Sequence, residues 1–248
     1  MPSKQPSKGP KGLTRLYLIL YNALSFALWA TCTVRGLYLL VTTMILPATS
    51  SSSSSDSETI INTALPAIFN DIYSPLLLGT QSLATLEILH SLLGLVRAPI
   101  FTTAMQVASR LLVVWGVMFL FGGESGKGAI VGSVQKGAQT GDFAFLGCLT
   151  AWGVTECIRY GFFALQVLGS GVPGWWTWLR YNTFYILYPL GITSECVLVV
   201  KALAPAGELE PLYQWFLIAV LGIYVPGSYI LYTHMIAQRK KVLKKRAE

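Results

Sequence analysis

Long apolar runs alternate with short polar segments along the whole chain. The apolar runs cover about 14–44, 72–95, a third stretch that ends near 121, 142–168, 175–203 and a sixth that ends near 238. Each is long enough for an α-helix to cross the hydrocarbon core of a bilayer, which takes about 20 residues. The pattern predicts an all-α polytopic membrane protein, a bundle of six transmembrane helices over 14–238, with polar tails at 1–13 and 239–248.

The polar segments between these runs predict loops and turns. They are a serine-rich stretch, TSSSSSSDSET, at 49–59, the turn VRAP at 96–99, a glycine-rich stretch at 122–141, the turn GSGVPG at 169–174, and a segment with prolines and glutamates that leads into the sixth run. The pattern gives no role to the serine run between Ser50 and Ser55.

Composition supports lipid as the solvent for most of the chain, and charge is concentrated at the two ends. Charged residues are 12% of the 248 positions, whereas soluble domains carry about 25%. Ten of the 18 lysines and arginines lie in 4–15 and 239–246. A basic excess can indicate nucleic-acid binding, but basic flanks beside apolar runs follow the positive-inside rule. With six crossings both termini then lie in the cytosol, and we expect no nucleic-acid partner.

Cysteine usage points away from metal or disulfide chemistry. The four cysteines lie within apolar runs, at Cys32, Cys148, Cys157 and Cys196. None has a second cysteine or a histidine at the spacing of a zinc site. We therefore expect them to pack as small hydrophobic side chains, and we expect neither a metal nor a cofactor.

Five ionisable residues interrupt the apolar runs, and they are Glu87, Arg110, Glu156, Arg159 and Glu195. Each would cost roughly 2.5–3.5 kcal/mol at a helix centre if it stayed unpaired, so all five are expected to face the bundle interior. Glu156 and Arg159 are three residues apart and share one helix face. Two interpretations stay open, a polar network that only holds the helices together and a site for a polar substrate.

The stretch RYNTFYILYPLGITSECVLVV, at 180–200, holds the sharpest of these patterns. Tyr181, Tyr188 and Glu195 follow at intervals of seven, so they lie close to one stripe of a helix. Pro189 removes an amide donor and Gly191 a side chain, which allows a kink and a close backbone approach. A carboxyl group in apolar surroundings can act as acid or base near neutral pH. With a phenol, it could remove a proton and expel a hydroxyl.

Four blocks in this order resemble the 3-hydroxyacyl-CoA dehydratase family of very-long-chain fatty acid elongation, also known as protein-tyrosine-phosphatase-like proteins. They are LYLILYNALSFALW at 16–29, LEILHSLLGLVRAPIFTTAMQVASRLLVVWGV at 86–117, TECIRYGFF at 155–163 and RYNTFYILYPLGITSE at 180–195. One departure is Ala98, where relatives carry a serine in the turn. No cysteine here precedes an arginine by six residues, so the Cys-x5-Arg loop of a phosphatase is missing.

The resemblance implies removal of water from a long-chain 3-hydroxyacyl-CoA to give the trans-2-enoyl-CoA. The family's Y-P-x-G-x-x-x-E motif maps its catalytic pair onto Tyr188 and Glu195. Its other polar positions map onto Glu156, Arg159, Arg180 and Gly191. Which of the pair acts at C2 is open, and we favour Tyr188 at C2 with Glu195 at the departing hydroxyl.

The remaining site expectations concern substrate positioning and location. Tyr181 and Glu87 are expected to support the pair. Four arginines are expected to line a cytosolic mouth for the anionic CoA headgroup, since guanidinium binds phosphate in a bidentate way. These arginines are Arg97, Arg110, Arg159 and Arg180. The resemblance further implies the endoplasmic reticulum membrane as location, and the condensing enzyme and reductases of elongation as partners. The basic end, KKRAE, agrees with that location.

Two other functional classes fit a chain with buried charges. A multi-pass transporter would use them to line a transport path, but the six runs show no internal repeat. A non-catalytic scaffold of the elongation complex would not need Tyr188 or Glu195, and both are present. The sequence does not specify acyl chain length or oligomeric state.

Overall fold

The computed structural model describes residues 11–50, 53–96, 98–123 and 128–247 and is helical along most of that length. In chain order the elements are α1 Gly12–Leu39, the π-helical η1 Leu40–Ile45, α2 Leu46–Ser50, α3 Ser54–Ile72, η2 Tyr73–Leu77, α4 Leu78–Leu83, α5 Thr85–Leu92, α6 Ile100–Leu111, η3 Leu112–Phe119, α7 Thr140–Leu168, α8 Gly174–Asn182, α9 Phe184–Leu209 and α10 Pro211–Ala247. The all-α class predicted from the hydrophobic pattern is confirmed.

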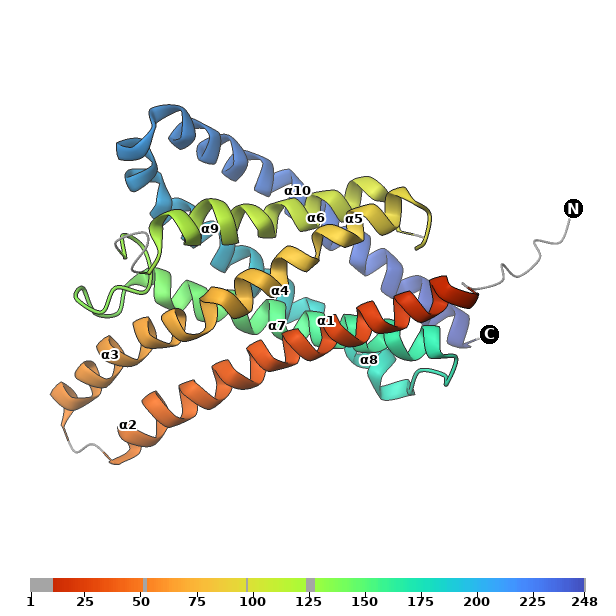
Figure 1. The fold of residues 1–248 in the computed structure, drawn as a ribbon, viewed down its shortest axis with the longest axis horizontal. Coiled ribbons are helices and arrows are strands. Elements are labelled where there is room, and N and C mark those ends of the chain that lie inside the picture. Colours follow the sequence, from red (N-terminus) through yellow and green to blue (C-terminus); the bar gives the residue numbers. More distant parts are fainter. Residues whose placement is uncertain (1–10, 51–52, 97, 124–127, 248) are drawn as a thin grey trace, which may run out of the picture.

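The helices form a bundle in which the chain reverses direction repeatedly (Figure 1). The start of α1, the end of α10, the α5–α6 turn and the α7–α8 turn lie at one end. The α2–α3 turn, the segment between η3 and α7, and the α9–α10 turn lie at the other. We call these the terminal end and the loop end of the bundle. Helices α7 and α9, which carry Glu156 and Glu195, run between these two ends.

Within the described residues, four helical segments are long and apolar enough to cross a membrane, and they are Gly12–Thr49, Ile100–Phe119, Phe184–Leu209 and Pro211–Lys244. They support the predicted polytopic membrane protein, while six crossings remain a prediction. The second predicted span is divided into short helices in the described structure. The fourth is α7, 29 residues long, whose charged Glu156 and Arg159 lower its hydropathy.

The prediction of a polar loop over 49–59 is wrong for its second half. Helix α2 continues to Ser50 and α3 begins at Ser54, so only a short connection separates them; Ser51 and Ser52 lie outside the described residues. The side chain of Ser53 accepts a hydrogen bond from the Asp56 amide at 3.2 Å, which is the N-cap arrangement that starts a helix. Asp56 also lies in the first turn, where an anion complements the helix dipole.

The boundaries predicted for the fifth and sixth spans also change. The stretch predicted as one span at 175–203 is divided at Thr183 into α8 and α9, and α9 stays helical through Pro189. Only Glu210 separates α9 from α10. Helix α10 then extends to Ala247, so most of the polar tail predicted at 239–248 continues the last helix.

Helix α7 packs most extensively against α1 on one side and α9 on the other. Glycines allow this close packing. A Cβ on Gly153 would lie 2.2 Å from the Thr33 hydroxyl of α1, and a Cβ on Gly147 would lie 2.2 Å from the Ser194 hydroxyl of α9. Both distances are shorter than real contacts. The sequence therefore places α9, and with it Glu195, directly against α7.

An ordered cap closes the loop end of the bundle. Asp142 accepts hydrogen bonds from the amides of Gly132 and Gln139, both at 2.8 Å. Asn70 of α3 donates to the Gly132 carbonyl at 2.9 Å, and the side chain of Asn62 accepts from the Ala138 amide at 3.1 Å. The later part of the glycine-rich stretch, residues 132–139, is thus held to α3 and to the start of α7.

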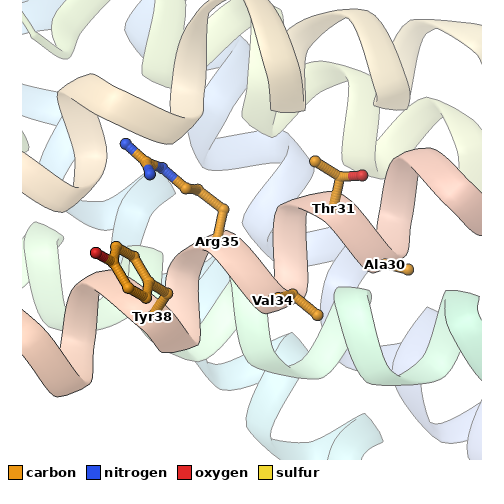
Figure 2. A pocket seen from close by; sticks show the side chains of 5 residues that line it. All are labelled: Ala30, Thr31, Val34, Arg35 and Tyr38. Carbon is orange, nitrogen blue, oxygen red and sulfur yellow. The ribbon is translucent and has the colours of Figure 1, made fainter.

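The outer face of α1 carries a shallow pocket lined by Ala30, Thr31, Val34, Arg35 and Tyr38 (Figure 2). Arg35 binds Asp71 of α3 through two hydrogen bonds, of 2.9 and 2.8 Å. The guanidinium also lies 5.8 Å from the centre of the Tyr38 ring. This exposed ion pair joins α1 to the end of α3 and is separate from the site described below.

Candidate active site

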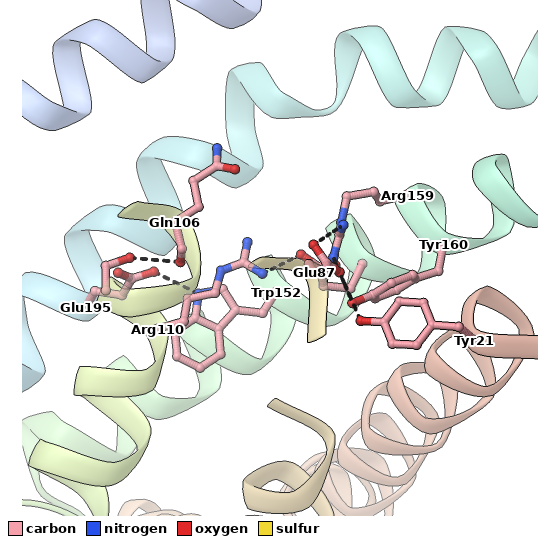
Figure 3. Close-up of polar contacts among 10 residues, drawn as sticks. Tyr21, Glu87, Gln106, Arg110, Trp152, Arg159, Tyr160 and Glu195 are labelled. Atoms are coloured by element: carbon pink, nitrogen blue, oxygen red, sulfur yellow. Dashed lines mark hydrogen bonds and ion pairs between the residues drawn. The ribbon is translucent and has the colours of Figure 1, made fainter. Parts of the chain in front are cut away.

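Glu195 is buried between α7 and α10 and is held by a hydrogen bond to each of its carboxylate oxygens. The indole N–H of Trp152, on α7, donates to Oε1 at 2.8 Å, as Figure 3 shows. The hydroxyl of Tyr224, on α10, donates to Oε2 at 2.8 Å. Only 6% of Glu195 is exposed. The carboxylate therefore faces the protein interior.

Tyr188 lies two turns before Glu195 on α9 and contacts the same neighbouring helix. Its hydroxyl donates to the Ser228 carbonyl of α10 at 3.1 Å, and its ring stacks on Tyr232, with the ring centres 5.7 Å apart. Ser228 is one turn from Tyr224, which binds Glu195. Along α9, seven residues correspond to about 10 Å. We call this line of contacts, formed by Tyr188, Glu195, Tyr224 and Ser228, the α9–α10 seam.

A second polar cluster consists of Glu87, Arg110, Glu156 and Arg159, and we call it the charge network (Figure 3). Arg159 donates to Glu87 at 2.7 and 2.8 Å and through Nε to Glu156 at 2.7 Å. Arg110 donates to the other oxygen of Glu156. Two acids and two bases thus neutralise each other across α5, α6 and α7, which lowers the cost of placing them in an apolar bundle.

Aromatic side chains complete the charge network on the α1 side. The Tyr160 hydroxyl donates to Glu87, and the Arg159 guanidinium lies 4.1 Å from the centre of the Tyr160 ring. The Tyr21 hydroxyl lies 3.5 Å from the same Glu87 oxygen. His90 packs edge-on against Tyr21, with the ring centres 4.7 Å apart. These contacts tie α1 to α5 and α7.

The charge network and the α9–α10 seam meet at Trp152. The Arg110 guanidinium lies 5.8 Å from the centre of the Trp152 ring, while the indole N–H binds Glu195. Trp152, Glu156 and Tyr160 follow at intervals of four on α7, so they share one face of that helix. One face of α7 therefore positions both clusters.

The family model described as "Protein tyrosine phosphatase-like protein, PTPLA" matches residues 81–245. This match covers the charge network and the α9–α10 seam. The chain belongs to this family. The resemblance found in the sequence is thereby confirmed.

Curated relatives of this family extend over nearly the whole chain. A "Probable very-long-chain (3R)-3-hydroxyacyl-CoA dehydratase" of Schizosaccharomyces pombe is 39% identical over 93% of this chain and 94% of its own length. The "Very-long-chain (3R)-3-hydroxyacyl-CoA dehydratase PASTICCINO 2" of Arabidopsis thaliana is 36% identical over the same shares. The "Very-long-chain (3R)-3-hydroxyacyl-CoA dehydratase 2" of Mus musculus is 32% identical over 95% of this chain and 84% of its own length. No solved structure matches the chain.

Several site residues expected from the family resemblance come together. Glu87, Arg110, Glu156 and Arg159 form one network, and Gly191 faces α7, where an added Cβ would lie 3.3 Å from the Cβ of Ala151. The close backbone approach expected at Gly191 is thus present. It brings α9 against the turn of α7 that carries Trp152.

The arginines expected at a CoA mouth divide into two groups. Arg110 and Arg159 are bound by carboxylates of the charge network. Arg180, on α8, instead lies over the rings of Phe162 and Phe163, 4.5 Å from each centre. It forms none of the ion pairs in the described part of the chain, and it lies 5.9 Å from the Tyr181 ring. Arg97 is outside the described residues.

Sequence reasoning missed four aromatic partners of the acids, which are Tyr21, Trp152, Tyr160 and Tyr224. For Trp152 and Tyr160 a signal existed, because each is four residues from Glu156. For Tyr224 and Tyr21 no local pattern distinguishes them from ordinary membrane tyrosines. Among the described residues, no group of three or more His, Cys, Asp or Glu side chains could hold a metal ion.

Proposed function

We propose that this chain is a hydro-lyase that dehydrates very-long-chain (3R)-3-hydroxyacyl-CoA to the trans-2-enoyl-CoA in the fatty acid elongation cycle. The observation that carries the proposal is the α9–α10 seam, where a buried carboxylate and a phenol lie two turns apart on one helix. Relatives named as this dehydratase align with 93% of the chain. A carboxylate and a phenol supply the base and the acid that β-elimination of water requires.

Glu195 is the better candidate for the base that removes the C2 proton. An indole N–H only donates hydrogen bonds, so Oε1 of Glu195 must accept from Trp152. The Tyr224 hydroxyl donates to Oε2. Hydrogen bonds donated to a carboxylate favour its ionised form. A carboxylate keeps further lone pairs beyond these two bonds, and one of them can take the proton.

Tyr188 is the better candidate for the acid that protonates the leaving hydroxyl. Its oxygen lies 3.1 Å from the Ser228 carbonyl oxygen. A phenolate at that distance would place two acceptors against each other, so the contact requires the protonated phenol. This assignment reverses the one favoured from the sequence, because the hydrogen-bond partners of Tyr188 and Glu195 were not visible there.

The proposed step balances in protons and electrons. Glu195 takes the C2 proton and leaves the C2–H electron pair as a thioester enolate, and that pair then forms the C2–C3 double bond as the C3–O bond breaks. The departing oxygen takes the Tyr188 proton and leaves as water. A proton then returns from Glu195 to Tyr188 through solvent and restores both groups. The neighbouring thioester acidifies the C2 proton.

The remaining site residues have supporting roles in this proposal. The charge network holds α7 in register with α5 and α6, and so positions Trp152 beside Glu195. Gly191 allows the α7–α9 contact. Arg180 and Tyr181 lie on α8 near the terminal end of the bundle, together with the α7–α8 turn (Figure 1).

The proposed location is the endoplasmic reticulum membrane with both termini in the cytosol. Helix α9 starts near the terminal end, so Tyr188 is closer to that end than Glu195 is. A CoA headgroup at the terminal end, near Arg180, would let the acyl chain extend inward past the pair. Other enzymes of the elongation cycle are the expected protein partners.

Incubation of the detergent-purified chain with a long-chain (3R)-3-hydroxyacyl-CoA tests the proposal. The expected product has lost one water by mass and carries a 2,3-double bond. Glu195→Gln and Tyr188→Phe are each expected to lower turnover by about 100- to 10,000-fold, the usual contribution of a general acid or base. Normal turnover in either variant, or no product from the unmodified chain, would contradict the proposal.

A further inference from the structure

Two neutral side chains from different helices bind the two oxygens of the same buried carboxylate. Trp152 comes from α7 and is 2% exposed, and Tyr224 comes from α10 and is 8% exposed. Both donor–acceptor distances to Glu195 are 2.8 Å. We call these two side chains the Glu195 clamp. A carboxylate bound at one oxygen can turn about its last bond, whereas one bound at both oxygens has a fixed plane.

The clamp differs from the usual means of holding a buried acid. Glu156 and Glu87 are each bound by arginine, and Glu195 forms none of the ion pairs in the described part of the chain. Neutral donors to the carboxylate favour its ionised form; the Arg110 guanidinium also attracts Glu195 electrostatically, but it forms its ion pair with Glu156. A base held in this way is oriented and keeps its negative charge available for the C2 proton.

We propose that Trp152 and Tyr224 are positioning residues for the dehydration, and that they orient Glu195 and offset part of the cost that burial adds to its ionised form. This inference rests on the proposed role of Glu195 as the base. It assigns a function to two residues that would otherwise be ordinary aromatic packing in a membrane bundle. Neither side chain needs to touch the substrate.

The tests are Tyr224→Phe and Trp152→Phe, which remove one donor each and keep an aromatic ring. Hydrogen bonds to charged groups contribute more than neutral ones, and a catalytic group must be held close to its productive geometry. We expect kcat to fall by about 10- to 100-fold in each variant while KM changes less than about threefold. Loss of packing alone would not separate kcat from KM in this way.

The pH dependence gives a second readout. The acidic limb of kcat/KM reports the essential base of the free enzyme. Removing a donor to the carboxylate disfavours its ionised form, so the acidic limb is expected to move to higher pH in both variants. Installing 3-fluorotyrosine at position 224 keeps the hydroxyl and makes it a stronger donor, so the limb is expected to move to lower pH.

Matched controls exist on α10 itself and on α8. Tyr213 of α10 donates to the Gly116 carbonyl at 2.8 Å, and Trp176 of α8 donates to the Ile158 carbonyl at 2.9 Å. Tyr213→Phe and Trp176→Phe remove the same kinds of donor without touching a carboxylate. Both controls are expected to keep kcat within about threefold of the unmodified enzyme, with an unchanged pH profile.

The outcomes separate this inference from the proposed function. If Glu195→Gln is inactive but both clamp variants match their controls in kcat and pH profile, the clamp has no positioning role. If Glu195→Gln is active, the proposed site itself is wrong. Should Tyr224→Phe fail to fold, the fluorotyrosine form decides, because an unmoved acidic limb there overturns the clamp.

Discussion

The two polar clusters of this bundle contain the same kind of acid in different surroundings. Glu156, in the charge network, is bound by Arg110 and Arg159. Glu195, in the α9–α10 seam, is bound by the neutral donors Trp152 and Tyr224. An acid that two arginines neutralise is well suited to holding helices together. An acid with neutral partners keeps its charge and can take a proton, so the partners indicate which cluster performs chemistry.

The largest expected contrast is between Glu195→Gln and Glu156→Gln. Glu195→Gln is expected to lose about 100- to 10,000-fold in turnover while unfolding at nearly the temperature of the unmodified protein, because glutamine still accepts from Trp152. Glu156→Gln leaves two arginines short of a carboxylate and should lower stability by about 3–5 kcal/mol. Turnover per folded molecule and thermal unfolding in detergent measure both.

The comparison would be wrong if the two variants exchanged these behaviours. A Glu156→Gln protein that is fully stable yet inactive would place chemistry in the charge network. A Glu195→Gln protein that is active but unstable would reduce Glu195 to a structural role.

Removing an opposite charge as well should partly restore the charge network. Arg110→Gln combined with Glu156→Gln eliminates one acid and one base, so the buried charge stays balanced. Residues in direct contact are coupled by about 0.5–3 kcal/mol, and we expect the double variant to be more stable than the sum of the single losses predicts. A double-mutant cycle of unfolding measures this coupling, and strictly additive losses would contradict it.

A smaller effect is expected where α7 and α9 meet. In Gly191→Ala the new Cβ would lie 3.3 Å from the Ala151 Cβ, so one helix must shift by a few tenths of an ångström. We expect a stability loss of about 1 kcal/mol, at the low end for overpacking, and a drop in kcat of a few fold, because Trp152 follows Ala151. Gly222→Ala is the control, since its Cβ position is open.

The smallest effect is expected at the exposed ion pair of α1 and α3. The side chains of Arg35 and Asp71 are 45% and 36% exposed, and solvent screening leaves exposed pairs with little effect on stability. Arg35→Gln should therefore leave turnover unchanged and lower stability only slightly. A large loss of activity would show that the pair acts on the site from a distance.

The sequence predicts the acids and bases of the charge network well, because charge in an apolar run is itself the signal. The spacing of Glu156 and Arg159 places them on one face, as observed. It does not give the register between helices, so the contact of Arg159 with Glu87 and of Tyr224 with Glu195 could not be predicted. Local patterns describe a single helix, whereas these contacts depend on how α5 packs against α7 and how α9 packs against α10.

The serine-rich stretch shows the opposite limitation. Its polarity suggested a loop, but Ser53 and Asp56 have the spacing of a helix start, and α3 begins there. The spacing of Ser53 and Asp56 could have predicted the helix start, but the serine-rich composition of the stretch favoured a loop. In the stretch 180–200, the break between two helices lies at Thr183. The sequence had instead predicted a kink at Pro189, one to two helical turns later.

Exchange of the C2 hydrogen with solvent tests the assignment of base and acid most directly. Tyr188→Phe should still remove the C2 proton without eliminating water, because it keeps Glu195 but lacks the group that protonates the hydroxyl. Incubated in D2O with a (3R)-3-hydroxyacyl-CoA, Tyr188→Phe is expected to incorporate deuterium at C2 with little enoyl product, and Glu195→Gln is expected to incorporate none. Deuterium incorporation by Glu195→Gln, with none by Tyr188→Phe, would contradict the account and make Tyr188 the base.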